Sequence, residues 1–202
     1  MLPPSDLIFF GAIAAVVIFL LVGNALFSTI LENPKVLFKE APLEKNKELQ
    51  LKPGETYTYS FTMNNSSVEM NFRVVEGRGC TGIMMLEAPN ASGVCLDRWG
   101  MEENGSNSAF TDPSILIFKP WMLALEEGWG WNNSMYVSYD GGENHVGDTF
   151  YRVVRMENYS GRESYLVEIS SDTGPAEYDW VDSDRRILLR AIGEGYEVKL
   201  EN

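Results

Sequence analysis

The residues that could support catalysis or metal binding are few in this 202-residue chain. The one histidine, His145, lies in a glycine-rich segment and cannot by itself build a multi-histidine zinc site. Cys80 and Cys95 are too far apart for a CxxC redox or zinc motif. The sequence contains no Gly-x-Ser-x-Gly elbow, phosphate-binding glycine loop or HExxH. These observations favour a protein that is not an enzyme and has neither metal nor cofactor, with an envelope hydrolase as the least favoured alternative.

Acidic side chains offer a second kind of chemistry. Segments 140–144 and 179–184 could ligate calcium through oxygen, but neither has the regular spacing of a calcium loop, and both are interpreted as turns. No particular pair among the 29 Asp and Glu residues is marked for glycoside hydrolysis. The formal charge of −13 repels phosphate backbones, so nucleic acid is not expected as a partner. A plainer interpretation is that the acids keep the domain soluble.

Tryptophans are the more informative residues. The chain has five Trp, ten Phe and nine Tyr, and the simplest interpretation is that these aromatics fill a core. The sharper hypothesis is a groove that binds an apolar ligand or a segment of a partner protein. Trp129 and Trp131 flank a glycine in a predicted loop, where exposed tryptophans indicate a partner. The predicted binding residues are Trp121, Met122, Trp129, Trp131 and Trp180.

An apolar segment precedes all of these residues. Twenty-five uncharged residues, Leu7 to Leu31, lie between Asp6 and Glu32, and as a helix they would span about 37 Å. This length fits a bilayer core of about 30 Å with modest tilt. No Lys or Arg precedes the run, and the run is longer than a usual signal-peptide core, so an uncleaved anchor is favoured over a cleaved signal. The predicted organisation is an anchor over residues 1–32, a stalk over 33–50 and a β-rich domain over 51–202.

Two groups of residues give opposite predictions for the side of the membrane on which the domain lies. Four lysines follow the span and place the domain in the cytoplasm by the positive-inside rule, although long domains cross largely regardless of charge. They are Lys35, Lys39, Lys45 and Lys47. Six Asn-x-Ser sequons, more than chance would supply, favour an extracytoplasmic domain. They begin at Asn64, Asn65, Asn90, Asn104, Asn132 and Asn158.

The cysteines favour the same side. Cys80 and Cys95 bracket a predicted hairpin formed by residues 80–87 and 94–99. A disulfide between them would stabilise the fold by roughly 3 kcal/mol in the chain-entropy model. We therefore predict a single-pass membrane protein whose C-terminal domain is extracytoplasmic, carries a Cys80–Cys95 bridge and is glycosylated at the sequons.

The predicted domain is mainly β. Alternating apolar and polar residues predict one hairpin from 56–63 and 68–74, with Tyr57, Tyr59, Phe61 and Met63 on one face. Five later segments, 149–157, 162–170, 176–182, 186–191 and 196–200, are joined by short turns and predict an antiparallel meander. Segment 112–127 is apolar and interrupted by Pro120, which predicts a short helical insertion that covers the sheet.

The C-terminal meander carries a resemblance. Three segments carry it: Gly147-Asp148-Thr149-Phe150-Tyr151, the hairpin Gly161-Arg162-Glu163-Ser164-Tyr165-Leu166-Val167 and the strand Tyr178-Asp179-Trp180-Val181-Asp182. Their pattern resembles the strand ladder of LolA/LolB-like envelope proteins. That resemblance, over residues 147–192, implies a curved antiparallel half-barrel closed by short helices, and no catalytic residues. The layout as a whole is similar to archaeal surface proteins with one N-terminal span and a β-rich ectodomain.

These patterns together predict an anchored, non-enzymatic binding domain that recognises an envelope protein or an apolar ligand. The alternative is a structural subunit of a cell-surface or membrane assembly. In that case the small residues Gly11, Ala12, Ala14 and Ala15 would help the anchor to pack against other spans.

Overall fold

The computed structural model describes residues 35–64, 66–77, 79–86, 94–100, 117–139, 142–172 and 174–201. The predicted anchor, Leu7 to Leu31, lies outside these residues. Within the described ranges, no helix has the length and apolar character needed to cross a membrane.

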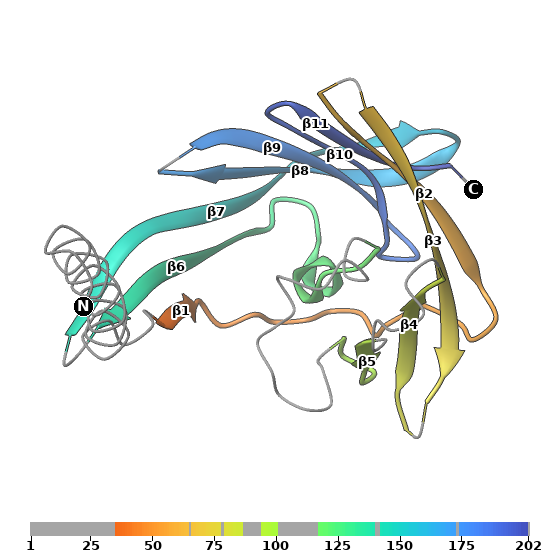
Figure 1. The fold of residues 1–202 in the computed structure, drawn as a ribbon, viewed down its shortest axis with the longest axis horizontal. Helices are drawn as coiled ribbons and strands as arrows, with labels where there is room; N and C mark the ends of the chain where they lie inside the picture. Colours follow the sequence, from red (N-terminus) through yellow and green to blue (C-terminus); the bar gives the residue numbers. More distant parts are fainter. Residues whose placement is uncertain are drawn as a thin grey trace, which may run out of the picture. The chain divides into compact units, whose positions relative to one another are not determined.

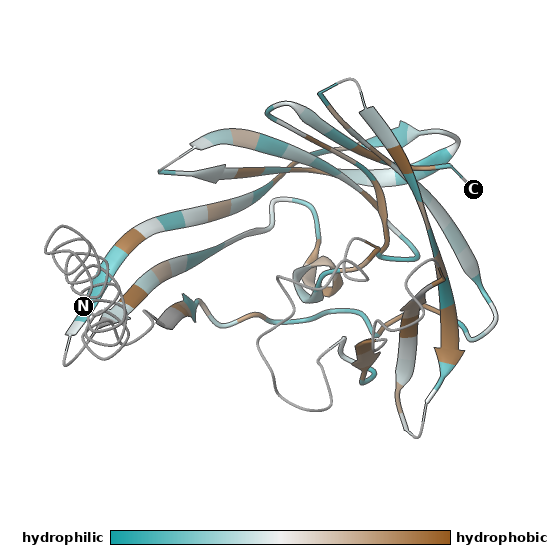
Figure 2. Cartoon of the chain, viewed as in Figure 1, coloured by the Kyte–Doolittle hydropathy of each residue, from teal (hydrophilic) through white to brown (hydrophobic). Residues whose placement is uncertain are grey.

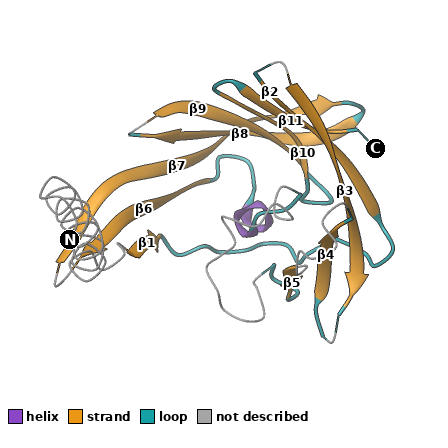
Figure 3. Ribbon diagram, in the orientation of Figure 1, coloured by secondary structure: helices purple, strands orange, loops and turns teal. Residues whose placement is uncertain are grey.

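The described chain forms one open antiparallel sheet of eleven strands with almost no helix (Figures 1 and 3). The sheet order is β1-β6-β7-β8-β9-β10-β11-β2-β3-β4-β5, which confirms the mainly β prediction. The strands are β1 (Lys35–Glu40), β2 (Thr56–Met63), β3 (Ser66–Glu76), β4 (Thr81–Met85), β5 (Val94–Leu96), β6 (Gly130–Tyr139), β7 (Gly142–Tyr159), β8 (Arg162–Ser171), β9 (Gly174–Asp182), β10 (Leu188–Gly193) and β11 (Tyr196–Leu200).

The chain divides into two compact units. The smaller comprises Met1–Phe38 and Met135–Val146, and the larger comprises Lys39–Ser134 and Gly147–Asn202. In the smaller unit the rings of Tyr136 and His145 lie 5.1 Å apart on β6 and β7. The larger unit contains the buried core and the candidate site described below.

The predicted meander and both predicted hairpins are present. Strands β7 to β11 follow one another as antiparallel neighbours, and β11 then pairs with β2. The β2–β3 register closes on the pair Met63↔Ser66, so the turn contains only two residues, of which Asn64 has a φ of 50°. This conformation is one that Asn tolerates better than most residues.

The sheet of the larger unit curves around the 3-10 helix η3 (Pro120–Ala124), as Figure 1 shows. We call the side of the sheet that packs toward η3 the inner face. It carries the fully buried side chains of Tyr59, Phe72 and Val167 together with the helical residues Met122 and Leu123. Hydrophobic residues gather along β3 and β10 in Figure 2. Where residues 117–127 are described, the predicted helical insertion is the single short helix η3, which begins at Pro120 and ends where the backbone becomes extended at Leu125.

The described part of the predicted stalk packs on the larger unit. Residues 41–50, here called the strap, follow β1 and run along η3. The backbone N–H groups of Asn46 and Lys47 donate to the carbonyl of Leu123 at 3.0 and 3.2 Å. The Asn46 side chain donates to the carbonyls of Ala124 and Leu125 at 3.3 and 3.2 Å. These bonds cap backbone groups at the end of η3, which is a structural role that a solvated spacer would not have.

The strap is also held at both of its ends. The N–H of Ala41 donates to Asn132 O at 3.1 Å, and the indole of Trp131 donates to Ala41 O at 2.9 Å. At the other end the N–H of Leu49 donates to Arg98 O at 2.8 Å. The sequence did not reveal this arrangement, since charged residues and prolines without periodicity are also typical of linkers.

Candidate functional site

Four of the five predicted binding residues meet on the inner face. Trp121 and Met122 belong to η3, Trp129 immediately precedes β6, and Trp131 is the second residue of β6. The rings of Trp121 and Trp129 are stacked with centroids 6.1 Å apart, and Tyr151 of β7 lies 5.4 Å from Trp121 and 5.0 Å from Trp131. Trp129 remains partly exposed, whereas Trp121 and Met122 are buried. These side chains pack on one another, as core aromatics do.

Trp180 does not join this group. It pairs with Arg190 across β9 and β10 on the outer face, and its ring lies 5.8 Å from that of Tyr159. The guanidinium of Arg190 lies 5.2 Å from the Trp180 ring, and the indole N–H donates to Glu157 at 2.5 Å. Trp180 therefore belongs to a separate aromatic and charged contact on the opposite side of the sheet.

A shallow depression is present elsewhere in the larger unit. It has a volume of about 150 Å³ and is lined by Tyr159, Ser160, Arg162, Leu189, Leu200 and Glu201. None of the predicted binding residues lines it, and it is smaller than the roughly 300 Å³ at which ligand pockets begin.

A group of charged residues on the inner face was missed by the sequence interpretation. Lys119, immediately before η3, lies with Nζ 3.7 Å from Asp179 Oδ2 and 3.9 Å from Glu177 Oε1. Asp179 and Glu177 both come from β9. We call these three residues the acid–lysine cluster. Asp179 is fully buried, whereas the side chains of Lys119 and Glu177 are each 27% exposed, so the cluster reaches solvent at one end.

The electrostatics of the acid–lysine cluster follow from burial. Burial raises the pKa of Asp179, the neighbouring Glu177 raises it further, and the positive charge of Lys119 opposes both effects. For Lys119, burial lowers the pKa, but Asp179 and Glu177 more than offset it, so the net shift is upward. Among the described residues, no donor lies within normal hydrogen-bond distance of either carboxylate oxygen of Asp179. Asp179 is thus a buried acid whose charge is balanced by the ion pair with Lys119 at 3.7 Å and not by close hydrogen bonds.

Aromatic hydroxyls surround this cluster. Burial raises the pKa of Tyr151, and a hydrogen bond with Asn133 of β6 lowers it in part. Burial and a hydrogen bond with Glu177 raise the pKa of Tyr196 on β11. Both hydroxyls are therefore neutral donors at physiological pH.

A second feature lies beside Tyr196 on the same face. The register pairs Tyr196 with Met63 and Phe61 with Val68, and the rings of Phe61 and Tyr196 are stacked 6.2 Å apart. Met63 is 47% exposed and Val68 is 58% exposed. We call Phe61, Met63, Val68 and Tyr196 the rim patch. It continues the buried apolar rows of β2 and β3 into solvent.

One signal could have pointed to the acid–lysine cluster. In segment 176–182, Glu177, Asp179 and Val181 alternate with Tyr178 and Trp180. The aromatic set is the more apolar, and it includes Trp180, one of the predicted binding residues. The structure turns Asp179 and Val181 inward, and segment 179–184, interpreted as a turn, begins within β9.

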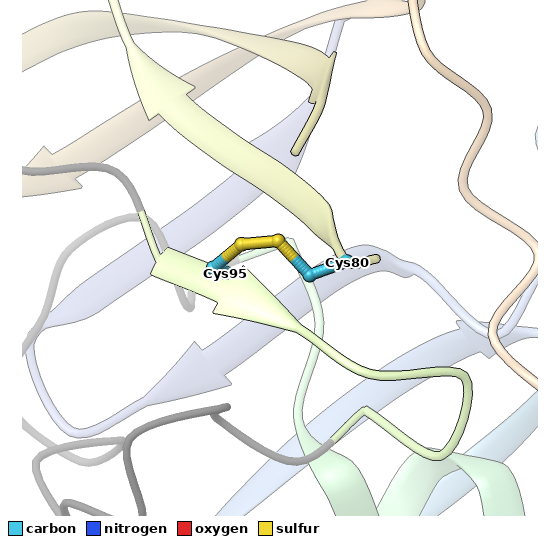
Figure 4. Close-up of a disulfide and its surroundings, with 2 residues drawn as sticks. All are labelled: Cys80 and Cys95. Atoms are coloured by element: carbon cyan, nitrogen blue, oxygen red, sulfur yellow. A yellow bond between two sulfur atoms is a disulfide. The ribbon is translucent and has the colours of Figure 1, made fainter. Parts of the chain in front are cut away.

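The predicted disulfide is present. Cys80 and Cys95 are bonded and join the start of β4 to β5 (Figure 4). Of the sequon residues, Asn64, Asn132 and Asn158 are exposed, whereas Asn65, Asn90 and Asn104 lie outside the described residues. Asn158 accepts a hydrogen bond from the N–H of Gly161 at 3.0 Å in the β7–β8 turn.

Across the ranges that the structure describes, no group of three or more His, Cys, Asp or Glu side chains is arranged to hold a metal ion. Neither a protein-family model, nor a curated protein, nor a solved structure matches this chain.

Proposed function

We propose that this protein is a membrane-anchored, extracytoplasmic binding domain that recognises a partner protein through the rim patch. The anchor is Leu7 to Leu31. The proposal needs no catalytic group, and it treats the open curved sheet as a scaffold of the half-barrel kind that the LolA/LolB-like resemblance implies.

The observation that carries the proposal is the exposure of Met63 and Val68 on the inner face. Along β2 and β3 this face is fully buried at Tyr59 and Phe72, yet it ends in two large apolar side chains that are 47% and 58% exposed. An apolar face that extends beyond its own core is typical of a surface that a partner covers. The stacked rings of Phe61 and Tyr196 beside it provide a rigid aromatic anchor, a feature common in interfaces.

Charge indicates the chemistry of the partner. Glu194, in the turn before Tyr196, is exposed, and Glu177 is partly exposed next to the Tyr196 hydroxyl. The chain as a whole carries a net charge of −13. We therefore expect a protein segment with apolar side chains flanked by Lys or Arg, since opposite charges at an interface rim speed association.

A photo-crosslinking experiment tests this function. The full chain, expressed in its host membrane, carries p-benzoylphenylalanine in place of Met63. The control carries it in place of Lys199, whose side chain is 41% exposed on the opposite face of the sheet. We expect crosslinks to one protein at position 63, none at position 199, and loss of the crosslink when Val68→Asp is added. Equal labelling at both positions, or a crosslink that survives Val68→Asp, would contradict the proposal.

The crosslinked species also distinguishes the alternatives. A lipid crosslinked at position 63 would indicate an apolar ligand instead of a protein. A second copy of this chain would indicate a structural subunit of a surface assembly. Both outcomes would replace partner recognition as the function.

The extracytoplasmic location rests on the Cys80–Cys95 bridge and on three exposed sequon residues, Asn64, Asn132 and Asn158. The test is protease treatment of intact cells, followed by mass analysis of the released domain. Cleavage from outside, with glycan mass at Asn132 or Asn158, is expected. Protection until the cells are lysed would place the domain in the cytoplasm and would favour the orientation that Lys35 and its neighbours indicate by the positive-inside rule.

A further inference from the structure

The acid–lysine cluster contains the three groups needed to form an amide between side chains. Lys119 offers a primary amine, Asp179 a carboxyl group, and Glu177 a second carboxyl group that can move protons. The amine nitrogen lies 3.7 Å from Asp179 Oδ2, an oxygen bonded to the carbon that the amine would attack. Asp179 is fully buried, and among the described residues no donor lies within normal hydrogen-bond distance of its oxygens.

We propose that Lys119 and Asp179 join in an intramolecular isopeptide bond, with Glu177 as the proton-transfer group. The bond would link the segment before η3 to β9 and so fix the helix on the inner face of the sheet. It would be a covalent modification of the fold and is independent of the partner-binding function proposed above.

The step balances without any co-reactant. Glu177 takes a proton from the Lys119 ammonium, and the neutral amine attacks Cγ of the protonated Asp179 carboxyl group to form the N–C bond. The proton on Glu177 passes to the departing hydroxyl, the C–O bond breaks, and one water molecule leaves. The amide nitrogen keeps one hydrogen, and Glu177 takes the remaining proton, which it returns to solvent through its exposed end.

The environment favours the reaction at this pair. Burial raises the pKa of Asp179 and therefore favours the neutral carboxyl group that an amine can attack. Tyr151, a neutral donor that borders the cluster, can stabilise the oxyanion that forms on the Asp179 oxygen, and Tyr196 hydrogen-bonds with Glu177. Because Asp179 has no exposed surface, water has little access to reverse the condensation.

The chain contains a matched internal control. Lys47 and Asp184 form a closer pair, with Nζ 2.8 Å from Oδ1, but the Asp184 side chain is 84% exposed. An exposed carboxyl group stays ionised and hydrated and does not react with an amine. Proximity alone would join Lys47 to Asp184, whereas the proposed mechanism joins only the buried pair.

Intact-mass analysis of the full chain, purified in detergent, tests the proposal. After removal of glycans and reduction of the disulfide, we expect a mass lower than the sequence mass by one water. Lys119 should resist an amine-reactive label under denaturing conditions, whereas Lys47 should be labelled completely. A digest should contain a branched peptide that joins Lys119 to Asp179.

Three variants assign the roles of the residues. Lys119→Arg retains the positive charge but lacks the reactive amine, and Asp179→Ala removes the carboxyl group, so both should have the full sequence mass. In the Glu177→Gln variant the bond between Lys119 and Asp179 should form at least tenfold more slowly. A wild-type chain of full mass, or one whose Lys119 is labelled as readily as Lys47, would overturn the proposal, and these readouts do not depend on whether any variant folds. Equally fast joining in Glu177→Gln would exclude Glu177 as the proton-transfer group.

Discussion

The disulfide gives the most quantitative prediction for this fold. Cys80 and Cys95 are separated by 15 positions, and a loop of that length contributes about 3 kcal/mol in the chain-entropy model. The contribution should fall largely on β4 and β5, because the bridge joins these two strands, which among the described residues pair at Thr81↔Leu96, Gly82↔Cys95 and Ile83↔Val94. Replacement of both cysteines by alanine should therefore lower the free energy of unfolding by about 3 kcal/mol.

Gly77 provides a second perturbation of the same contact. A Cβ added at this position would lie 2.9 Å from Cys95 Sγ and closer still to Cys80 Sγ. With the disulfide present, Gly77→Ala should cost about 1–3 kcal/mol through overpacking. In the Cys80→Ala/Cys95→Ala background the sulfur atoms are gone, and the same change should be within about 0.5 kcal/mol of neutral.

The assay is equilibrium unfolding of the full chain by urea in mild detergent, followed by the fluorescence of the buried tryptophans. Four proteins complete the cycle: wild type, Gly77→Ala, the cysteine double variant and the triple variant. We expect a coupling energy of about 1–3 kcal/mol between Gly77 and the disulfide. An equal cost of Gly77→Ala in both backgrounds would refute the steric argument, and a disulfide contribution below about 1 kcal/mol would refute the loop-entropy argument.

Three further changes test the rest of the larger unit. Tyr59→Phe should cost about 1–2 kcal/mol in urea unfolding, because the buried hydroxyl donates to Leu188 O at 2.6 Å; an unchanged midpoint would mean that this bond is not formed in solution. Burial raises the pKa of Glu55, but donors from the Lys52 backbone, Tyr57 and Arg185 more than offset it, so the net shift is downward. A carboxylate with a lowered pKa stabilises the fold above its unfolded pKa, near 4.5, and this contribution is lost as the pH falls through its folded pKa. Glu55→Gln should therefore cost about 1 kcal/mol at neutral pH and flatten the loss of stability below about pH 4.5; parallel pH profiles would contradict this. Asn46→Ala should cost about 1 kcal/mol and speed proteolysis within the strap, since two hydrogen bonds to the end of η3 are lost; unchanged cleavage would show that backbone contacts alone hold the strap.

Strands β2 to β5 and β8 to β11 could be predicted from the sequence to within a few residues. Strands β1 and β6 were not predicted, and β7 begins at Gly142, within the segment 140–144 that was interpreted as a turn. Period-2 alternation and short polar turns mark β2, β3 and the meander β7 to β11, because neighbouring strands with tight connections must pair antiparallel. The bracketing of a hairpin by Cys80 and Cys95 likewise predicted the disulfide. These are local features: each strand and turn is marked by a few neighbouring residues, and the two cysteines are only 15 positions apart.

The sequence did not show in the same way which side chains of a strand point to the inner face and which to the outer face. Alternation identifies two faces, but in β9 one carries Tyr178 and Trp180 and the other carries Glu177, Asp179 and Val181. Hydrophobicity alone selects the aromatic face as the inner one. The β-bulge between Leu188 and Arg190 also shifts the register between β9 and β10. Counting alternate residues from β9 therefore does not show which residues of β10 face inward.

The sequence by itself determined the strand order of the meander, the hairpins and the position of the disulfide, since each depends on residues close together in the chain. Only the tertiary structure placed the strap on η3 and brought Lys119 to Asp179, sixty positions further along. Such contacts depend on how the whole sheet curves around the helix. The free-energy cost of burying the Asp179 carboxyl group is offset by Lys119, a partner that no local sequence pattern identifies.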